Sequence, residues 1–376
     1  VLTYGGISLF VVAFAIAPIA SALFRQADIP KRLMPAAIAL GAFTFTMTAL
    51  PGSPAIQNAI PMPYFGTNPF AAPGLGIIAG LLMFALGMAW LTRRAKQARV
   101  SGEGYGEHAD AAPQPDRTMR EYADREGFDV MELEGRAAAG PGTPTFMVAV
   151  APVVLVILVN FLSVKYLFPH LDTSFLSEPL FGATSLESVQ GIWAVVLALT
   201  AACFLVVALN RGRLNQLQQT LDAGANASVG PIFNTASLVG FGAVMAAIPA
   251  FELVRDWVLG VGGDNPLISA AVAMSMMGGI TGSASGGMSI ALSVFGETYA
   301  QLAHDFGVAP ELMHRVSSVA SGGLAILPHN GAVISLLMVC GLRHRESYLD
   351  IFVVAGLGPI ISLVVLIVLG SLFGSF

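Results

Sequence analysis

Long apolar stretches alternate with short polar ones along most of the chain. Apolar runs of helix length fall at residues 5–24, 33–50, 73–91, 145–168, 190–210, 228–250, 266–295, 316–340 and 351–374. About 20 apolar residues are enough to cross the hydrocarbon core of a bilayer as a helix, which satisfies its own backbone hydrogen bonds. The pattern therefore predicts an all-α polytopic membrane protein with the lipid bilayer as its solvent.

The composition agrees with this prediction. The 376 residues are 55% hydrophobic and 11% charged, whereas a water-soluble domain has about 25% charged residues. Cys203 and Cys340 both lie in apolar runs, which favours buried hydrophobic side chains over a disulfide. Metal-ligand spacings, phosphate-binding loops and dinucleotide fingerprints are absent from the sequence. We expect no cofactor, no metal ion and no nucleic-acid partner.

The segment 92–144 differs from the rest, because its charges are mixed in sign and Gly and Pro are frequent. It predicts a hydrophilic linker between a first domain, residues 1–91, and a second domain, residues 145–376. Lys and Arg flank the apolar runs in four groups, at residues 25–32, 93–99, 211–213 and 343–345. The positive-inside tendency places these flanks and the linker in the cytoplasm.

The same rule predicts a re-entrant segment. Between Arg213 and Arg343 the chain has to cross the membrane an even number of times, yet it contains three apolar runs. One run should therefore enter and leave on the same side. We expect this to be Ser228–Pro249, as a hairpin with Asn234 and Thr235 at its tip, because these polar residues suit a lipid-facing helix poorly.

Four short matches connect the two ends of the chain in the same order. They are YGGISL (4–9) with SGGMSI (285–290), IPKRLM (29–34) with APELMH (309–314), LPGSPAIQ (50–57) with LPHNGAVI (327–334), and PGLGIIAGLL (73–82) with AGLGPIISLV (355–364). The charge rule places residues 25–32 inside and their counterparts, 296–311, outside. Two copies of opposite orientation indicate an inverted-repeat secondary transporter. We expect the first copy to be incomplete at its N-terminus.

Four polar interruptions lie within the apolar runs: TMTALPGSPAIQN (46–58), FNTAS (233–237), GGITGSASGG (278–287) and SGGLAILPHNG (321–331). Gly or Pro opens the helix in most of them, and Ser, Thr, Asn and Gln supply donors and acceptors. Helices broken in opposed copies turn their N-termini toward a common point, where free N–H groups and helix dipoles attract anions. The predicted substrate-binding residues are Ser53, Gln57, Asn58, Asn234, Thr235, Ser283, Ser285, His329 and Asn330.

Other interpretations of these residues remain open. Close helix packing explains any one Gly-rich interruption taken alone. His329 is the one histidine inside an apolar run, and it could contact substrate, couple protons or make a structural hydrogen bond. A passive channel is a rival function, and so is an intramembrane serine hydrolase that uses GSASGG with His329 as base. The hydrolase leaves the repeat unexplained, so we expect a carrier and not an enzyme.

The motifs resemble those of the gluconate permease (GntP) family of bacterial carriers. The similarity is carried by ALPGSPAIQNAIP (49–61), PYFGT (63–67), GPIFNTASLVGFG (230–242), GGITGSASGGMSIAL (278–292), ASGGLAILPHNGAVISLL (320–337) and CGLRHRESYLDI (340–351). The resemblance implies proton-coupled uptake of gluconate or a similar small hydroxy-carboxylate across the bacterial inner membrane, by elevator-type motion. It leaves open D-serine or 3-hydroxybutyrate as substrate, sodium as coupling ion, and a homodimer.

Overall fold

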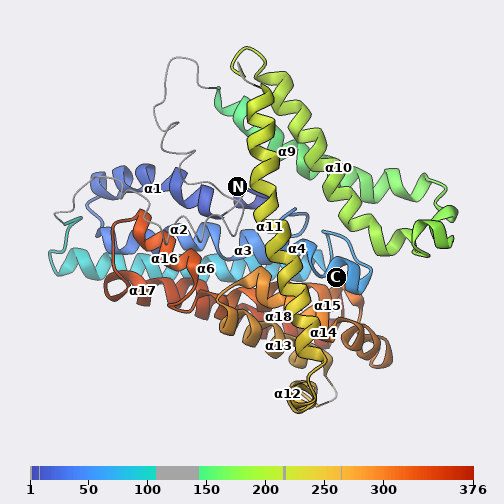
Figure 1. Cartoon of the computed structure of the whole chain (residues 1–376). Coiled ribbons are helices and arrows are strands. Elements are labelled where there is room, and N and C mark those ends of the chain that lie inside the picture. The colour runs from blue at the N-terminus through green and yellow to red at the C-terminus, as the bar shows by residue number, and fades with distance from the viewer. Residues whose placement is uncertain (1, 8, 107–143, 215–216, 264) are drawn as a thin grey trace.

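The computed structural model describes residues 2–7, 9–106, 144–214, 217–263 and 265–376 (Figure 1). Every regular element within these ranges is helical. The longer helices are α1 (Leu9–Gln26), α6 (Pro73–Val100), α9 (Phe146–Leu162), α10 (Leu186–Leu209), α11 (Leu217–Ala246), α12 (Ala250–Gly260), α13 (Pro266–Thr281), α14 (Ala284–Asp305), α15 (Pro310–Gly323) and α18 (Gly358–Phe373). The shorter ones are α2 (Met34–Ala42), α3 (Phe45–Thr48), α4 (Ile56–Ala59), α5 (Met62–Phe65), α16 (Gly331–Val339) and α17 (His344–Phe352). The all-α prediction is confirmed.

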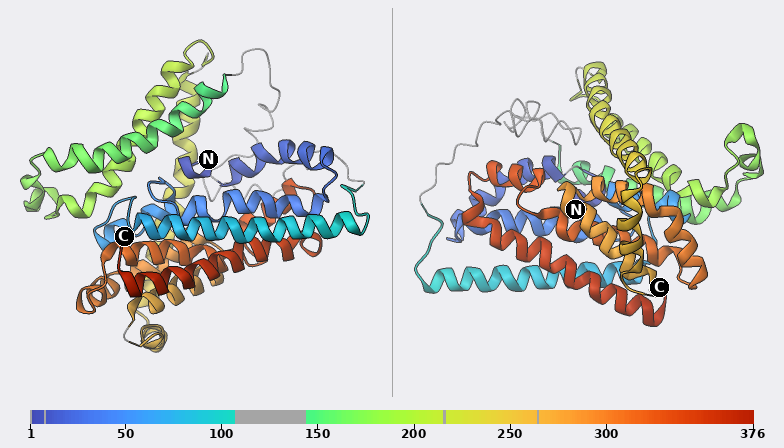
Figure 2. Two further views of the ribbon diagram at one scale, coloured as in Figure 1. Left: turned by 180° about the vertical axis from the view of Figure 1, so that it is seen from behind. Right: turned by 60° about the horizontal axis from the view of Figure 1, so that its bottom comes forward.

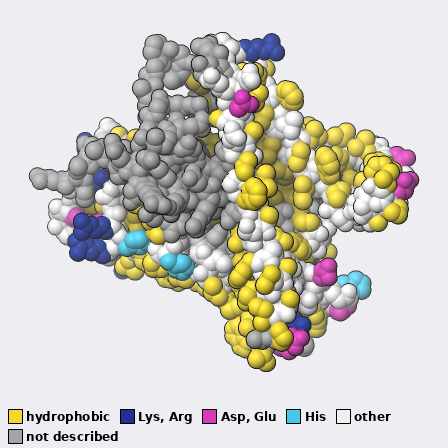
Figure 3. Space-filling model, viewed as in Figure 1, with side chains coloured by type: hydrophobic (Ala, Val, Ile, Leu, Met, Phe, Trp, Pro, Cys, Tyr) yellow, Lys and Arg dark blue, Asp and Glu magenta, His cyan; other side chains and the backbone are white. Residues whose placement is uncertain are grey.

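Four of the helical stretches are long and apolar enough to cross a membrane: Pro73–Val100, Phe146–His170, Ser188–Leu209 and His344–Phe373. A fifth span arises if the bent pair Pro310–Ile326 and Gly331–Val339, which meet at 58°, counts as one. Large apolar side chains are exposed on each of these four stretches, among them Leu81, Val154, Trp193 and Val364. Apolar side chains also cover much of the face of the molecule shown in Figure 3. This surface is suited to lipid, because hydrocarbon tails are as apolar as the side chains.

Helices α6 and α18 lie side by side and run antiparallel (Figure 2). At one end the amide of Gly74, at the start of α6, donates to the carbonyl oxygen of Phe376 at 2.8 Å. At the other end Arg94 Nε of α6 donates to Asp350 Oδ1, which precedes α18, at 2.8 Å. These are the matching helices of the two sequence copies, and antiparallel packing is the arrangement that an inverted repeat requires.

Asp350 joins three segments at the basic end of the molecule. Its side chain is 1% exposed and accepts from Arg94, from Arg32 Nη1 at 3.2 Å and from Trp90 Nε1 at 2.9 Å. Three of the four basic flanks therefore meet at one end of the bundle, as a common membrane side requires. Arg32 also pairs with Glu103 at 2.7 Å, and this hydrogen bond is the main reason that the pKa of the Glu103 carboxyl lies below its ordinary value.

The predicted linker and hairpin are only partly as expected. Helix α6 continues to Val100, so the first residues of the segment 92–144 are helical, and residues 107–143 lie outside the described ranges. The prediction of a hairpin at Ser228–Pro249 is wrong, because α11 runs from Leu217 to Ala246 as one uninterrupted helix. Asn and Thr cost a helix only about 0.6 kcal/mol each relative to Ala, which is too little to break it.

The helical hairpin lies instead at α13–α14. Helix α13 ends at Gly282, whose φ of +62° is the left-handed conformation that favours glycine, and α14 begins at once behind Ser283. The Ser283 side chain accepts from the amide of Gly286 at 3.1 Å and so caps α14. The tip of the hairpin is therefore the sequence Thr281-Gly282-Ser283, within one of the four polar interruptions.

The closeness of α13 and α14 yields a first prediction. A Cβ atom added at Gly287 would lie 2.4 Å from the amide nitrogen of Gly278 on the opposite helix. Backbone cannot rotate out of the way as a side chain can, so Gly287→Ala should force the two helices apart and cost about 1–3 kcal/mol of unfolding free energy. Thermal unfolding of the purified protein in detergent measures this cost.

Gly240→Ala is the matched control. A Cβ at Gly240 on α11 would meet no atom within 4 Å, and Ala in a helix interior is about 1 kcal/mol more favourable than Gly. Gly240→Ala should leave the midpoint temperature of thermal unfolding unchanged or raise it. A Gly287→Ala variant as stable as Gly240→Ala would contradict the close packing of the hairpin.

Candidate substrate site

The sequence ILPHNGAV forms a break between two helices. Helix α15 ends at Gly323, a single 3-10 turn follows at Leu324–Ile326, and α16 begins at Gly331 at an angle of 58°. Pro328 lacks an amide hydrogen and disfavours helix in the residue before it. Asn330 then starts the new helix, since its side-chain oxygen accepts from the amide of Val333 at 3.0 Å.

The hairpin tip and this break are bonded to each other through one side chain. Asn330 Nδ2 donates to the carbonyl oxygen of Gly282 at the tip at 2.7 Å. It also donates to the carbonyl oxygen of Ala325 on its own side of the break. All polar atoms of the Asn330 side chain are thus engaged, and the two interruptions form one rigid junction.

A cavity of about 490 Å³ opens at this junction. Its polar lining comes from the tip, from the break and, through Gln57, from the interrupted helix of the first sequence copy. Leu238 of α11 contributes from the helix that crosses over α14 (Figure 1). Among the described residues that line it there is no Asp, Glu, Lys or Arg, and His329 is the one titratable side chain. The cavity is therefore polar without a fixed charge.

Two helix N-termini open onto this cavity. Ala284 and Ser285 are the first residues of α14, Gly331 and Ala332 are the first residues of α16, and all four line the cavity. Within the part of the chain that the structure describes, none of their four amides donates a hydrogen bond. Free amides at the positive ends of two helix dipoles suit an anion.

The nine predicted residues divide into three groups. The cavity is lined by Gln57, Ser283, Ser285, His329 and Asn330. Ser53 and Asn58 are 0% exposed and are not part of the lining. The side chains of Asn234 and Thr235 lie outside what the structure describes, although their helix, α11, passes the cavity at Leu238.

Ser53 and Asn58 organise the first interruption. Ser53 Oγ donates to the carbonyl oxygen of Tyr4 at 3.0 Å and accepts from the amide of Ala55 at 3.1 Å. Asn58 Nδ2 donates to the carbonyl oxygens of Ser53 and Pro69 at 2.8 and 2.9 Å. The polar groups of both side chains bind backbone groups that the broken helix leaves without a partner. Neither side chain is therefore placed to bind a ligand directly.

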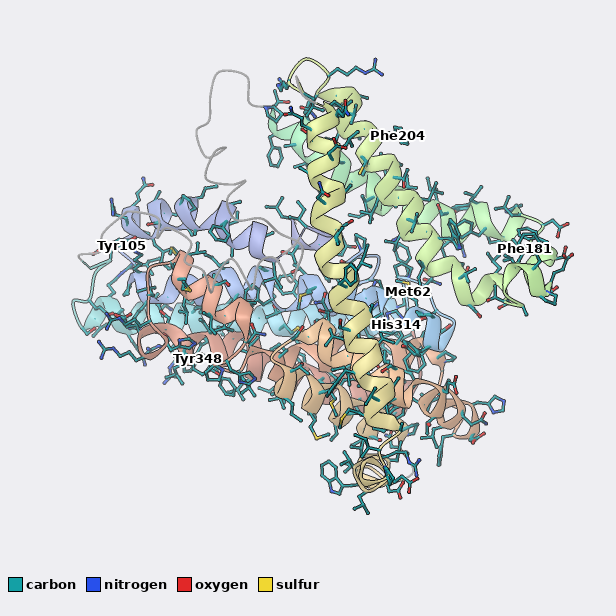
Figure 4. The ribbon with its side chains drawn as sticks, viewed as in Figure 1. Met62, Tyr105, Phe181, Phe204, His314 and Tyr348 are labelled. Atoms are coloured by element: carbon teal, nitrogen blue, oxygen red, sulfur yellow. The ribbon has the colours of Figure 1, made fainter. Side chains whose placement is uncertain are left out.

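Sequence reasoning missed Arg315 and His314, which are both 0% exposed. His314 lies in the interior of the bundle (Figure 4), and its ring nitrogens contact Thr67 Oγ1 at 2.7 Å and Asn58 Oδ1 at 3.1 Å. In the sequence, Arg315 stands directly before the apolar run 316–340. The available signal was the sequence of α15, in which Ser317, Ser318 and Ser321 closely follow His314 and Arg315. All of these side chains are buried, so their polar groups need partners from the protein.

Arg315 binds backbone from the first copy of the repeat. Its Nη1 donates to Asn58 Oδ1 at 3.0 Å and to the carbonyl oxygen of Thr48 at 3.3 Å, and its Nη2 donates to the carbonyl oxygen of Ala71 at 2.7 Å. Thr48 ends α3, so its carbonyl group would otherwise lack a partner. Arg315 thereby connects α15 to the interrupted helix that presents Gln57.

A comparison with curated proteins found a relative named "Uncharacterized transporter YxjC" from Bacillus subtilis (strain 168). The two chains are 42% identical over 360 residues, which cover 94% of this chain and 73% of the relative. The chain belongs to the YxjC transporter family. This family and the helical fold identify a multi-pass membrane transporter and not an enzyme. No protein-family model and no solved structure matches the chain.

Proposed function

We propose that this YxjC-family transporter is a secondary active carrier for proton-coupled uptake of gluconate or a similar small hydroxy-carboxylate across the bacterial inner membrane. The observation that supports this most is the pair of helix N-termini, from α14 and α16, that open onto one cavity with free amides. The substrate carboxylate would accept hydrogen bonds from these amides. Gln57, Ser285 and His329 would bind its hydroxyl groups.

The lack of a fixed charge in the cavity lining fits a carrier. A buried cation would bind the anion tightly, would hinder its release, and would cost several kcal/mol to keep desolvated when the site is empty. Helix dipoles and neutral donors attract the carboxylate without that cost. The cavity volume of about 490 Å³ falls in the range of about 300–1,000 Å³ that is usual for small-molecule sites.

The junction at Asn330 gives the proposed transport cycle a moving unit. The hairpin α13–α14 and the broken pair α15–α16 share this hydrogen-bonded junction, so they would move together in an elevator-type step. His329 lines the cavity, is exposed, and has no hydrogen bond to another described residue. Its imidazole would be the group that carries the coupled proton.

Uptake by the purified full-length transporter in proteoliposomes tests the proposal. An inward proton gradient should drive uphill accumulation of labelled gluconate, and a sodium gradient alone should not. Uptake driven only by sodium would make the protein a sodium-coupled carrier. If D-serine or 3-hydroxybutyrate is taken up and gluconate neither is taken up nor competes, that compound and not gluconate would be the substrate. Equilibration without uphill accumulation would indicate a channel and contradict the proposal.

We expect Gln57→Ala to reduce gluconate uptake by about tenfold, since it removes a hydrogen bond worth about 1–1.5 kcal/mol. His329→Ala should reduce uptake by at least as much and should abolish its acceleration by an inward proton gradient, because the coupled proton then has no carrier. His329 makes no structural hydrogen bond among the described residues, so its variant should unfold at the wild-type temperature. His304→Ala, whose side chain is 86% exposed, is the control and should transport normally. Wild-type uptake by both cavity variants would place the substrate elsewhere.

A further inference from the structure

A second cavity, of about 440 Å³, lies at the basic end of the molecule. It has no lining residue in common with the substrate cavity. We call it the basic pocket. It is formed by the 3-10 turn before α2, the end of α6 and its following segment, and the start of α17. Its lining residues are Pro30, Lys31, Arg32, Arg94, Glu103, Gly104, Tyr105, Gly106, Leu342, Arg345 and Glu346.

The cations that line the basic pocket differ in how they are neutralised. Arg32 and Arg94 are paired with Glu103 and Asp350 at distances of 2.7 and 2.8 Å. The carboxylate of Glu346 accepts from a backbone amide at the start of α17. Lys31 and Arg345 remain, and neither side chain has a hydrogen bond or ion pair with any residue that the structure describes.

Lys31 is the more unusual of the two, because only 6% of its surface is exposed. A buried ammonium group without a partner is strongly disfavoured. Its Nζ lies near Gly341, just beyond the C-terminus of α16. That helix end supplies only about half an elementary charge, and it is screened by solvent nearby. An anion in the pocket would neutralise Lys31 more completely.

We propose that the basic pocket binds the phosphate group of an anionic membrane lipid, with Lys31 and Arg345 as its cationic contacts. The pocket lies where α6 leaves the membrane, beside the cluster that joins α6 to α17. Lys and Arg side chains gather at this end of the molecule (Figure 3), and Tyr105 lies there as well (Figure 4). Basic pockets between membrane helices on the cytoplasmic side are typical sites for anionic headgroups.

The surroundings of the basic pocket favour a lipid over a free anion. Leu349 lies about one helical turn from Arg345 on α17 and is 62% exposed. Apolar surface so close to a headgroup site suits acyl chains. Arg32 and Arg94 line the pocket and also hold Asp350. A bound lipid would therefore strengthen the connection between segments of the two repeat copies.

The test measures thermal unfolding of the full-length protein in detergent during titration with dihexanoyl phosphatidylglycerol, dihexanoyl phosphatidylcholine or inorganic phosphate. Phosphatidylglycerol should raise the unfolding temperature and the other two should not. Lys31→Gln should raise the phosphatidylglycerol concentration needed for half of this effect by about fivefold or more, since each Lys or Arg near an anionic headgroup contributes about that factor. Without lipid, Lys31→Gln should be at least as stable as the wild type.

Lys96→Gln is the matched control, because Lys96 lies on the exposed surface of the same end of α6 and does not line the basic pocket. It should respond to phosphatidylglycerol as the wild type does. If both variants lose the stabilisation by phosphatidylglycerol to the same extent, the lipid is attracted by the general surface charge, and the proposal is overturned. If inorganic phosphate stabilises the protein as much as phosphatidylglycerol does, the pocket binds a free anion and not a lipid, and the proposal is overturned. If Lys31→Gln does not fold, Arg345→Gln at an exposed position has to show the weakened response, and a wild-type response would overturn the proposal.

Discussion

Arg315→Met is expected to lower the unfolding free energy by about 2 kcal/mol or more, because it leaves two buried acceptors without donors at about 1–3 kcal/mol each. These are the carbonyl oxygens of Thr48 and Ala71, whereas Asn58 Oδ1 keeps its contact with the His314 ring. Both carbonyl groups belong to the first sequence copy. The variant should therefore unfold at a markedly lower temperature in detergent and lose the monodisperse peak in size-exclusion chromatography.

Two further variants separate the causes of this loss. Arg315→Lys keeps the charge but not the planar fork of donors, so it should fall between the wild type and Arg315→Met. Arg255→Met replaces an exposed arginine whose described partner is the neighbouring Asp256, and it should unfold like the wild type. The account of Arg315 is wrong if Arg315→Met is as stable as Arg255→Met.

Asn330→Asp should reduce uptake at least about tenfold and lower the unfolding temperature. The aspartate retains the oxygen that accepts from the amide of Val333, so α16 keeps its cap. It loses the donor to the carbonyl oxygens of Gly282 and Ala325 and turns a negative charge toward both. The buried carbonyl group of Ala325 without a donor costs about 1–3 kcal/mol, the partly buried one of Gly282 costs less, and the negative charge at the cavity repels an anionic substrate.

The control for this variant is Asn226→Asp, which makes the same substitution on the exposed surface of α11. It should transport and unfold like the wild type. Measurements with the wild type and both variants in the same proteoliposome preparation remove differences in lipid and internal pH. Normal gluconate uptake by Asn330→Asp would show that the junction between hairpin tip and broken helix does not serve transport.

Arg315→Met and Asn330→Asp remove side chains that play the same structural role at two different interruptions. Arg315 holds the first interruption against α15, and Asn330 holds the hairpin tip against α16. In both cases a side chain replaces the backbone hydrogen bonds that a continuous helix would have made. The interruptions are thus stabilised by long-range bonds, while the first two amides of α14 and of α16 stay free and face the cavity.

The sequence by itself determined the features that depend on local chemistry. Apolar runs of spanning length predicted the helices, because a chain in lipid must satisfy its backbone within each segment. Pro328 predicted the break in ILPHNGAV, since proline lacks the amide donor that a continuous helix requires. Asn330 was predicted to bind substrate, and its role as the cap of α16 comes from the structure. The repeated motifs, taken with the charge rule, predicted opposite orientations for the two copies, and this stays a prediction.

Only the tertiary structure decided which apolar run forms the hairpin and what the buried polar residues bind. The charge rule gives the number of crossings but does not identify the run that turns back. The small helix penalty of Asn234 and Thr235 does not show whether the chain turns back there or at Gly282. Arg315 and Asn58 are 257 positions apart in sequence, yet they are in hydrogen-bond contact. The sequence around either residue does not predict this contact, because a polar side chain is buried only where distant segments of the chain supply its hydrogen-bond partners.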